Sequence, residues 1–344
     1  MKTVYSDDHR LQNGKAELID GKLQPCFEMP RRADIVLARV RDRKLGPVLA
    51  PERFGTDPIL RVHKPDFVKF LETAWDEWVK AHGAYDALPL NWMAPGMHRS
   101  LPETIDGKLS YYSFDAGTPI TAGTWRAIVS AVDVAMTGVK LVKGGERVAF
   151  SLCRPPGHHA GSDFYGGYCF FNNAAVAAQA FRDGGAGRVA VLDVDYHHGN
   201  GTQEIFYRRD DVLTISIHAD PRQEFPFFIG HADERGEGRG EGYHMNLPLR
   251  WGAAWDQYGP AMDSAMRRIA EYGPDAIVVS LGVDTFEKDP ISKFKLRHED
   301  YLEIGAAIAA AGKPTLFVME GGYAVEELGI NAVNVLEGFE GAVK

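Results

Sequence analysis

Apolar runs of strand length recur in the second half of the chain and alternate with segments of helical spacing or composition. The strand-like runs cover residues 148–152, 189–192, 212–217, 276–281 and 315–319, and the helical segments cover residues 173–182, 255–272 and 300–311. Nearly continuous apolar strands separated by helices are typical of a parallel sheet that is covered on both faces. The pattern therefore predicts an α/β fold, in which the ligand site lies at the carboxyl ends of the strands.

The first half of the chain is more helical. Residues 65–80 place their large apolar side chains on one helical stripe, as in a helix that packs against a core. A second helix is predicted over residues 124–136. The stretch between them is polar, with scattered glycine and proline, and a compact domain rarely contains so long a loop unless it is functional or lies in an interface. We therefore expect a single domain over residues 1–344 with an insertion at about residues 82–123.

The amino-acid composition is that of one well-packed globular domain, and the net charge limits the classes of ligand that the protein is expected to bind. Hydrophobic residues make up 45% and aromatic residues 11% of the 344 residues, and no Ser/Pro-rich linker or internal repeat divides them. The formal net charge of −9 argues against a general nucleic-acid-binding protein. It mildly favours a cationic ligand, although solubility explains it equally well.

The sequence carries no visible targeting signal. Residues 1–15 lack the apolar core of a signal peptide, and no run approaches the ~20 apolar residues that span a bilayer. The three cysteines, Cys26, Cys153 and Cys169, form no pairable framework, which is typical of a reducing compartment. We therefore expect a cytoplasmic protein without a membrane partner.

Two acids and a histidine alternate directly after the predicted strand at residues 189–192, at Asp193, Asp195 and His197. Alternate residues of an extended chain share a face, so these side chains are expected to project the same way from the end of the strand. Carboxylate and imidazole ligands suit a divalent metal such as zinc. Taken alone the signal is weak, because acids and histidines are common at strand ends in α/β proteins.

Polar tracts follow three other predicted strands. The turn Pro155-Pro156-Gly157 is stiff and precedes His158 and His159, whose imidazoles titrate near neutrality and suit proton transfer. Asp284 and Tyr323 follow the last two strands, in each case beside glycine. Taken separately, a surface histidine pair and a packing tyrosine would be the ordinary interpretations.

Together these tracts suit the metal-assisted hydrolysis of an amide. Asp195, His197 and Asp284 supply three ligands and leave an open position, as catalytic zinc requires. One of the paired histidines would take the proton of water, and Tyr323 would donate a hydrogen bond to the developing oxyanion. Two carboxylates and one imidazole do not distinguish Zn²⁺ from Fe²⁺.

The same tracts resemble the zinc-dependent histone deacetylase superfamily. The resemblance is carried by RPPGHH at 154–159, GGYCFFNNAAVAA at 166–178, DVDYHHGNGTQEIF at 193–206, SLGVDTF at 280–286 and EGGY at 320–323. It extends from about residue 28 to the last helix. It implies the arginase/deacetylase fold, a single α/β domain with an eight-stranded parallel sheet flanked by helices, here with a long inserted loop.

The resemblance also assigns roles to individual residues. Asp195, His197 and Asp284 would be the zinc ligands, His159 the general base and acid, and Tyr323 the group that polarises the scissile carbonyl.

Further roles concern the groups around these residues. His158 would support His159 electrostatically, with Asp193 holding His158 and Asn200 holding His159. Some relatives carry Asp at the position of Asn200, which leaves the balance between the two histidines open. Structural K⁺ is implied at two places, one near Asp193, Asp195, His197 and Ser216 and the other near Phe206 and Val212.

Within the superfamily, residues 101–107 and 117–120 look like the acetylpolyamine amidohydrolase branch. Members of that branch are dimers in which the insertion of one subunit narrows the active-site channel of its partner. A narrow channel excludes folded protein and admits a thin, flexible amine. The resemblance therefore implies a homodimeric deacetylase of small cationic acetylated amines of the acetylputrescine, acetylcadaverine and acetylspermidine type.

Five residues are candidates for contact with such a substrate. Asp106 and Asp115 would provide negative charge at the rim of the channel, although a solvated surface acid is an equally good interpretation of each. The rings of Tyr168 and Phe225 would flank the methylene chain, and Gly167 would let that chain approach closely.

Three other functions remain as alternatives. A deacetylase of acetyl-lysine in proteins or peptides would share the site but have a wider mouth. A binuclear manganese ureohydrolase would need more metal-facing carboxylates than the tract around Asp284 supplies. A binding protein that recognises acylated amines without turnover would be expected to lack Tyr323 or one of the paired histidines.

Overall fold

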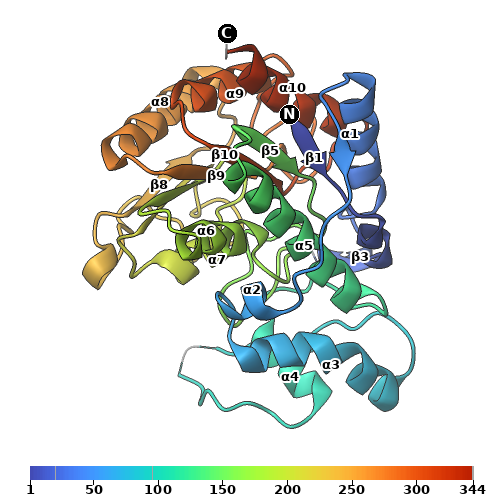
Figure 1. The fold of residues 1–344 in the computed structure, drawn as a ribbon. Coiled ribbons are helices and arrows are strands. Elements are labelled where there is room, and N and C mark those ends of the chain that lie inside the picture. Colours follow the sequence, from blue (N-terminus) through green and yellow to red (C-terminus); the bar gives the residue numbers. More distant parts are fainter. Residues whose placement is uncertain (20, 95, 343–344) are drawn as a thin grey trace.

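An eight-stranded sheet forms the centre of the molecule (Figure 1), in a computed structural model that describes residues 1–19, 21–94 and 96–342. In spatial order its strands are β4 (Val48–Leu49), β1 (Lys2–Val4), β5 (Val148–Ser151), β10 (Thr315–Met319), β9 (Ala276–Leu281), β6 (Val189–Asp193), β7 (Val212–Ala219) and β8 (His244–Leu249). Neighbouring strands run parallel throughout this sheet. The predicted fold class, a single α/β domain with an eight-stranded parallel sheet, is confirmed.

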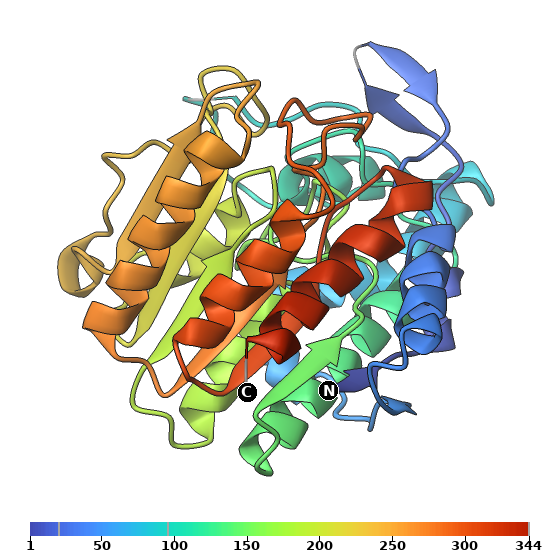
Figure 2. The same cartoon turned by 90° about the horizontal axis from the view of Figure 1, so that it is seen from above.

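Helices cover both faces of the sheet (Figure 2). One layer contains α1 (Arg31–Asp42), α8 (Trp255–Tyr272), α9 (Asp300–Ala310) and α10 (Val325–Gly341), and the other contains α5 (Thr124–Lys143), α6 (Asn173–Asp183) and α7 (Asn200–Phe206). The short helix α2 (Asp57–Leu60) and the antiparallel hairpin of β2 (Glu17–Ile19) and β3 (Lys22–Gln24) lie outside these layers.

Strand β9 illustrates why the central strands are mostly apolar on both faces. Ile277, Val279 and Leu281 pack in the core formed with α8, α9 and α10, whereas Ala276 and Val278 pack in the core formed with α5 and α6. Alternate side chains of a strand point to opposite faces, so a strand covered on both faces has no solvent-facing position. Charged side chains are therefore kept to the ends of the central strands, as Asp193 is at the end of β6.

The insertion at residues 82–123 contains more regular structure than a long loop. It follows α3 (Pro65–His82) and includes α4 (Ile105–Tyr112), whose first turn is capped by the Thr104 hydroxyl accepting a hydrogen bond from the Gly107 amide. Ile105, Leu109 and Tyr112 are buried against α3, and their helical spacing is hidden within a mostly polar sequence. An antiparallel bridge between Ala87 and Ile120 closes the base of the insertion.

The strands that the hydrophobic pattern did not predict lie at the edges of the sheet. β1 and β4 have three and two residues, too few for a recognisable pattern. Residues His244–Leu249 form β8, an edge strand that tolerates Asn246 and Pro248. Among the described residues, no helix has both the length and the apolar character needed to cross a membrane.

Candidate active site and metal centre

Four strands deliver the predicted site residues to one edge of the sheet. β5, β10, β9 and β6 are neighbours and run in the same direction, so the segments that follow them meet at their carboxyl ends. The histidine pair follows β5, and Tyr323 follows β10. Asp284 follows β9, and the tract that begins with Asp193 lies at the end of β6.

Asp195, His197 and Asp284 form a buried cluster whose ligand atoms all lie within 4.8 Å of one another. His197 Nδ1 is 3.0 Å from Asp284 Oδ2 and 3.5 Å from Asp195 Oδ1. Burial and the charge of Asp195 raise the pKa of Asp284 to about 7. Two carboxylates buried this closely repel one another, and a divalent cation relieves that repulsion, so the three residues fit a metal ion.

Two glycines make room for this cluster. A Cβ at Gly282 would lie 1.9 Å from Asp195 Oδ2, and a Cβ at Gly321 would lie 2.5 Å from the same oxygen. The Gly321 amide also donates a hydrogen bond of 2.9 Å to that oxygen. The glycines of the two tracts therefore have a steric role beside Asp195.

Asp193 lies beside His158, as the resemblance implied, and is not one of the three clustered metal-ligand residues. It is the last residue of β6, and its Oδ2 lies 2.9 Å from His158 Nδ1. The period of two applies only while the chain is extended, and the segment after Asp193 has left the strand.

The two paired histidines have opposite electrostatic surroundings. Burial disfavours charge on His158, but the carboxylates of Asp195 and Asp193 outweigh it and raise the pKa of His158 to about 10. His159 Nδ1 instead lies 2.6 Å from the amide oxygen of Asn200. Burial and the neighbouring His158 charge hold the pKa of His159 well below its usual range. At neutral pH, His158 is therefore cationic and His159 is a neutral base.

Tyr323 is buried and its hydroxyl stays protonated, because burial raises the pKa of Tyr323 well above its usual value. The Arg32 guanidinium lies 4.7 Å from the centre of its ring. Arg32 also donates hydrogen bonds to the carbonyl oxygens of Gly322 and Glu320, at 2.7 and 2.6 Å. Arg32 lies in α1, far from the recognisable motifs, and the sequence did not identify it.

Aromatic rings line the approach to the histidines. The ring of Phe225 lies 5.2 Å from that of His159, and the ring of Tyr168 lies 5.4 Å from that of Tyr323. Phe114, from the insertion, stacks on Phe225 with ring centres 5.6 Å apart. Sequence analysis missed Phe114, because its contact with Phe225 joins segments that share no motif.

Gly167 packs directly against His159. A Cβ at Gly167 would lie 2.3 Å from the ring of His159, and the residue has a φ of +56°. The missing side chain therefore makes room for the imidazole of His159, and contact of Gly167 with a substrate chain stays a prediction.

The two candidate rim acids have partners within the subunit. Asp115 accepts hydrogen bonds from the Gly167 amide at 2.6 Å and the Thr118 hydroxyl at 3.0 Å, so it supports the turn beside His159. Asp106 Oδ1 lies 3.0 Å from His82 Nε2 at the surface. Contact of either acid with a substrate stays a prediction.

Glu17 is a buried acid beside Tyr168 that the sequence did not single out. It is fully buried, and Oε1 accepts a hydrogen bond from the Phe27 amide, while Oε2 has no partner within 3.5 Å. Burial raises the pKa of Glu17 to about 7.

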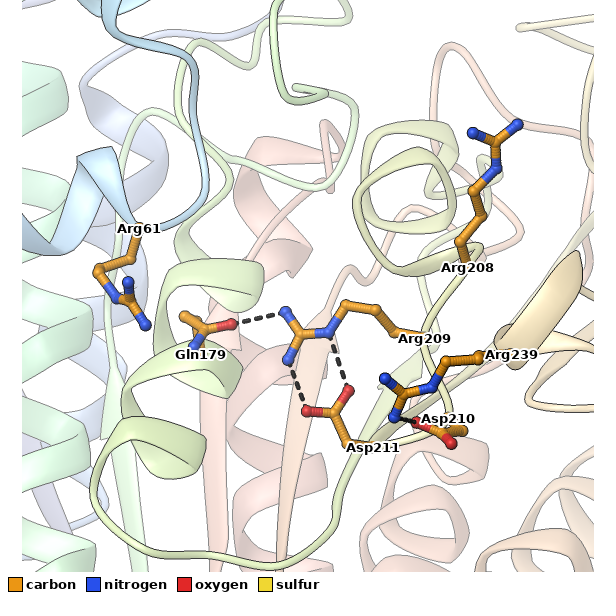
Figure 3. Close-up of a pocket in the computed structure, with 7 residues that line it drawn as sticks. All are labelled: Arg61, Gln179, Arg208, Arg209, Asp210, Asp211 and Arg239. Atoms are coloured by element: carbon orange, nitrogen blue, oxygen red, sulfur yellow. Dashed lines mark hydrogen bonds and ion pairs between the residues drawn. The ribbon is translucent and has the colours of Figure 1, made fainter.

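A cleft lined by arginines lies near the amino-terminal end of β7 (Figure 3). Each of its arginines pairs with an acid: Arg61 with Asp183, Arg208 with Glu237, Arg209 with Asp211, and Arg239 with Asp210. The cleft contains none of the predicted catalytic residues, and its positive charges are already compensated.

Comparison with known proteins identifies the family. A model of the histone deacetylase domain matches residues 26–339. The chain belongs to the histone deacetylase family. Acetylpolyamine amidohydrolase 2 of Pseudomonas aeruginosa is 60% identical over 341 residues, which cover 99% of each chain. Acetylpolyamine amidohydrolase of Mycoplana ramosa is 50% identical over 341 residues, covering 99% of this chain and 100% of that protein.

Solved structures in this family have the same architecture. Acetylpolyamine aminohydrolase from Burkholderia pseudomallei superposes with a TM-score of 0.94 at 37% identity, with 99% of each chain covered. The HDA15 HD domain superposes with a TM-score of 0.81 at 26% identity, with 99% of this chain and 91% of that chain covered. The resemblance inferred from the motifs is therefore confirmed along nearly the whole chain.

Proposed function

We propose that this protein hydrolyses the amide bond of N-acetylated polyamines, releasing acetate and the free amine, with Zn²⁺ or Fe²⁺ held by Asp195, His197 and Asp284. The observation that carries the chemistry is the arrangement of the paired histidines beside the buried metal-ligand cluster, with His158 against Asp193 and His159 against Asn200. Sequence identity of 50% to 60% to acetylpolyamine amidohydrolases along nearly the full chain supports the choice of substrate.

The residues divide the reaction between them. A divalent metal in this cluster supplies Lewis acidity, which acidifies water and polarises the amide carbonyl. His159 accepts a proton from the attacking water through Nε2, because its Nδ1 is engaged by Asn200. Tyr323 donates a hydrogen bond to the carbonyl oxygen as negative charge develops there.

The second half of the reaction requires a proton on the leaving nitrogen. The protonated His159 delivers it as the C–N bond breaks, so the amine leaves in a neutral form. His158 stays cationic between Asp193 and Asp195. Its positive charge stabilises the negative charge that develops on the carbonyl oxygen of the scissile amide.

The wall of the channel supports a thin substrate. Phe114, Phe225 and Tyr168 offer apolar surface for a methylene chain beside His159 and Tyr323. The net charge of −9 favours a polycation over a neutral amide. Asp106 and Asp115 are proposed as acids that face the distal ammonium in the assembled enzyme.

We infer that the insertion forms a homodimer interface. It carries large apolar side chains that are exposed in the single chain: Tyr85, Leu90, Trp92, Met93, Met97 and Leu101. A soluble chain rarely exposes so many large apolar groups in one segment unless another surface covers them. Structural K⁺ is also proposed beside Asp193 and Ser216, which are paired in register on β6 and β7.

Steady-state kinetics test the substrate. We expect kcat/KM for N-acetylputrescine, N-acetylcadaverine and N-acetylspermidine to exceed kcat/KM for an acetyl-lysine peptide by at least about tenfold, a difference of ~1.4 kcal/mol in transition-state binding. A much higher value for the peptide would replace the polyamine proposal by the peptide deacetylase alternative.

The metal is tested separately on the same preparation. Removal of metal with a strong chelator should abolish hydrolysis, and stoichiometric Zn²⁺ or Fe²⁺ should restore it. Full activity in metal-free protein would refute the proposed chemistry for every substrate.

A further inference from the structure

Tyr323 has little local support from its own segment. It follows Gly321 and Gly322, and Gly322 has a φ of +127°, so the two residues before the tyrosine have the conformational freedom of glycine. The helix α10 begins only at Val325, and its N-cap residue, Ala324, has no side chain that can accept a hydrogen bond from the helix.

A carboxylate from another loop supplies the missing support. Asp289 Oδ2 accepts hydrogen bonds from the backbone amides of Tyr323, at 2.6 Å, and Ala324, at 3.1 Å. The side chain of Asp289 is buried, with 6% of its surface exposed. An acid at the N-terminus of a helix also interacts favourably with the helix dipole.

The other oxygen of Asp289 belongs to the segment that follows Asp284. Oδ1 accepts a hydrogen bond of 3.1 Å from the Ile291 amide. The Asp289 amide in turn donates a hydrogen bond of 3.0 Å to the Phe286 carbonyl, and an isolated β-bridge pairs Phe286 with Leu296. One carboxylate therefore connects the loop that carries a metal ligand to the loop that carries the catalytic hydroxyl.

We propose that Asp289 is a positioning residue for catalysis, which fixes the Tyr323 hydroxyl relative to the metal-ligand cluster. This inference rests on the proposed function, because it assigns to Tyr323 the stabilisation of the amide oxyanion. A hydrogen bond to a developing charge depends steeply on geometry, and a displacement of about 1 Å can lower a rate by about a hundredfold. Loss of the Asp289 bonds should therefore affect kcat more than KM.

A double-mutant cycle with Tyr323→Phe tests this coupling in the full-length protein. We expect Asp289→Ala to lower kcat by about 10- to 100-fold with KM changed by less than about threefold. In the Tyr323→Phe background, the same Asp289→Ala change should lower kcat by less than about threefold, because the hydroxyl that Asp289 positions is already absent.

Two further variants separate positioning from general stability. Asp289→Asn keeps one oxygen that can accept the Tyr323 and Ala324 amides, so its kcat should stay close to that of wild type and well above that of Asp289→Ala. Asp275→Ala is the matched control, because Asp275 Oδ2 accepts the amides of Gly187 and Arg188, at 2.6 and 3.0 Å, on loops away from the active site. It should leave kcat unchanged even if it lowers Tm.

The outcomes are distinct. An unchanged kcat in both Asp289 variants would overturn the inference, and so would an effect of the same size with and without the Tyr323 hydroxyl. In either case a wild-type enzyme that hydrolyses acetylated polyamines leaves the proposed function standing. A wild-type protein that hydrolyses no acetylated amine would overturn the function and the inference together.

Discussion

Replacing Asn200 by aspartate should change the pH at which the general base operates. The Asn200→Asp side chain is nearly the same size, and it would place a carboxylate oxygen where Asn200 Oδ1 now lies 2.6 Å from His159 Nδ1. The neighbouring ring illustrates the effect, because His158 is also buried and lies near two carboxylates, Asp195 at 3.7 Å and Asp193 at 2.9 Å. Its pKa is raised to about 10, whereas the pKa of His159 is lowered.

The expected magnitude follows from this comparison. An opposite charge at hydrogen-bond distance raises the pKa of an imidazole by about 1 to 3 units, which corresponds to about 1.4 to 4 kcal/mol in favour of its protonated form. The base must be neutral to accept a proton, so a raised pKa removes activity from the acidic side of the profile. The acidic limb of kcat/KM should therefore move upward by about 1 to 3 pH units, and activity below that limb should fall about tenfold per unit.

The assay is the pH dependence of kcat/KM for N-acetylputrescine between about pH 5.5 and 9.5, since the limbs of kcat/KM report groups of the free enzyme. Asn246→Asp is the matched control. Asn246 Oδ1 lies 3.1 Å from the buried His244 Nε2, so this variant makes the same change beside a histidine outside the site. Superimposable pH profiles for wild type and Asn200→Asp would refute His159 as the base. A shift of equal size in Asn246→Asp would show that the effect does not come from contact between the new carboxylate and His159.

Two further predictions concern Tyr323 and Glu17. Tyr323→Phe should retain metal but lose about 10²–10³ in kcat, equally at pH 6 and pH 9, because the hydroxyl does not ionise there. The control is Tyr272→Phe, because Tyr272 is buried and its hydroxyl donates a hydrogen bond to the Asp210 carbonyl, away from the site. Near-normal turnover in Tyr323→Phe would remove Tyr323 from the mechanism. For Glu17, folding raises the pKa from 4.5 to about 7, so the folded state binds the proton more tightly and wild type loses stability as pH rises between these values. Above pH 7, Glu17→Gln should therefore unfold at a higher urea concentration than wild type, with a free energy of unfolding larger by up to about 3 kcal/mol. Near pH 4 the two proteins should be equally stable. An equal difference at both pH values would contradict this account.

The strand-end residues were predictable because their position depends on local features. The run of β9 is apolar except for Ser280 and ends abruptly in Gly282 and Asp284, which marks both the strand and its carboxyl end. The direction of parallel strands then brings Asp195, His197 and Asp284 to the same edge, without further information. The helix α4 and the strand β8 were not predictable in this way, because mixed polar sequences conceal their buried positions.

By itself, the sequence determined the α/β architecture and the set of chemical groups at its catalytic edge. The tertiary structure decided how those groups differ in charge and orientation, since each difference comes from a partner distant in the chain. The protonated form of His158 is favoured because the carboxylates of Asp195 and Asp193 reach it. The Nδ1 of His159 instead faces the neutral amide of Asn200, and burial keeps its imidazole neutral. Contacts of this kind depend on packing between loops, and neither hydrophobic period nor local propensity encodes them.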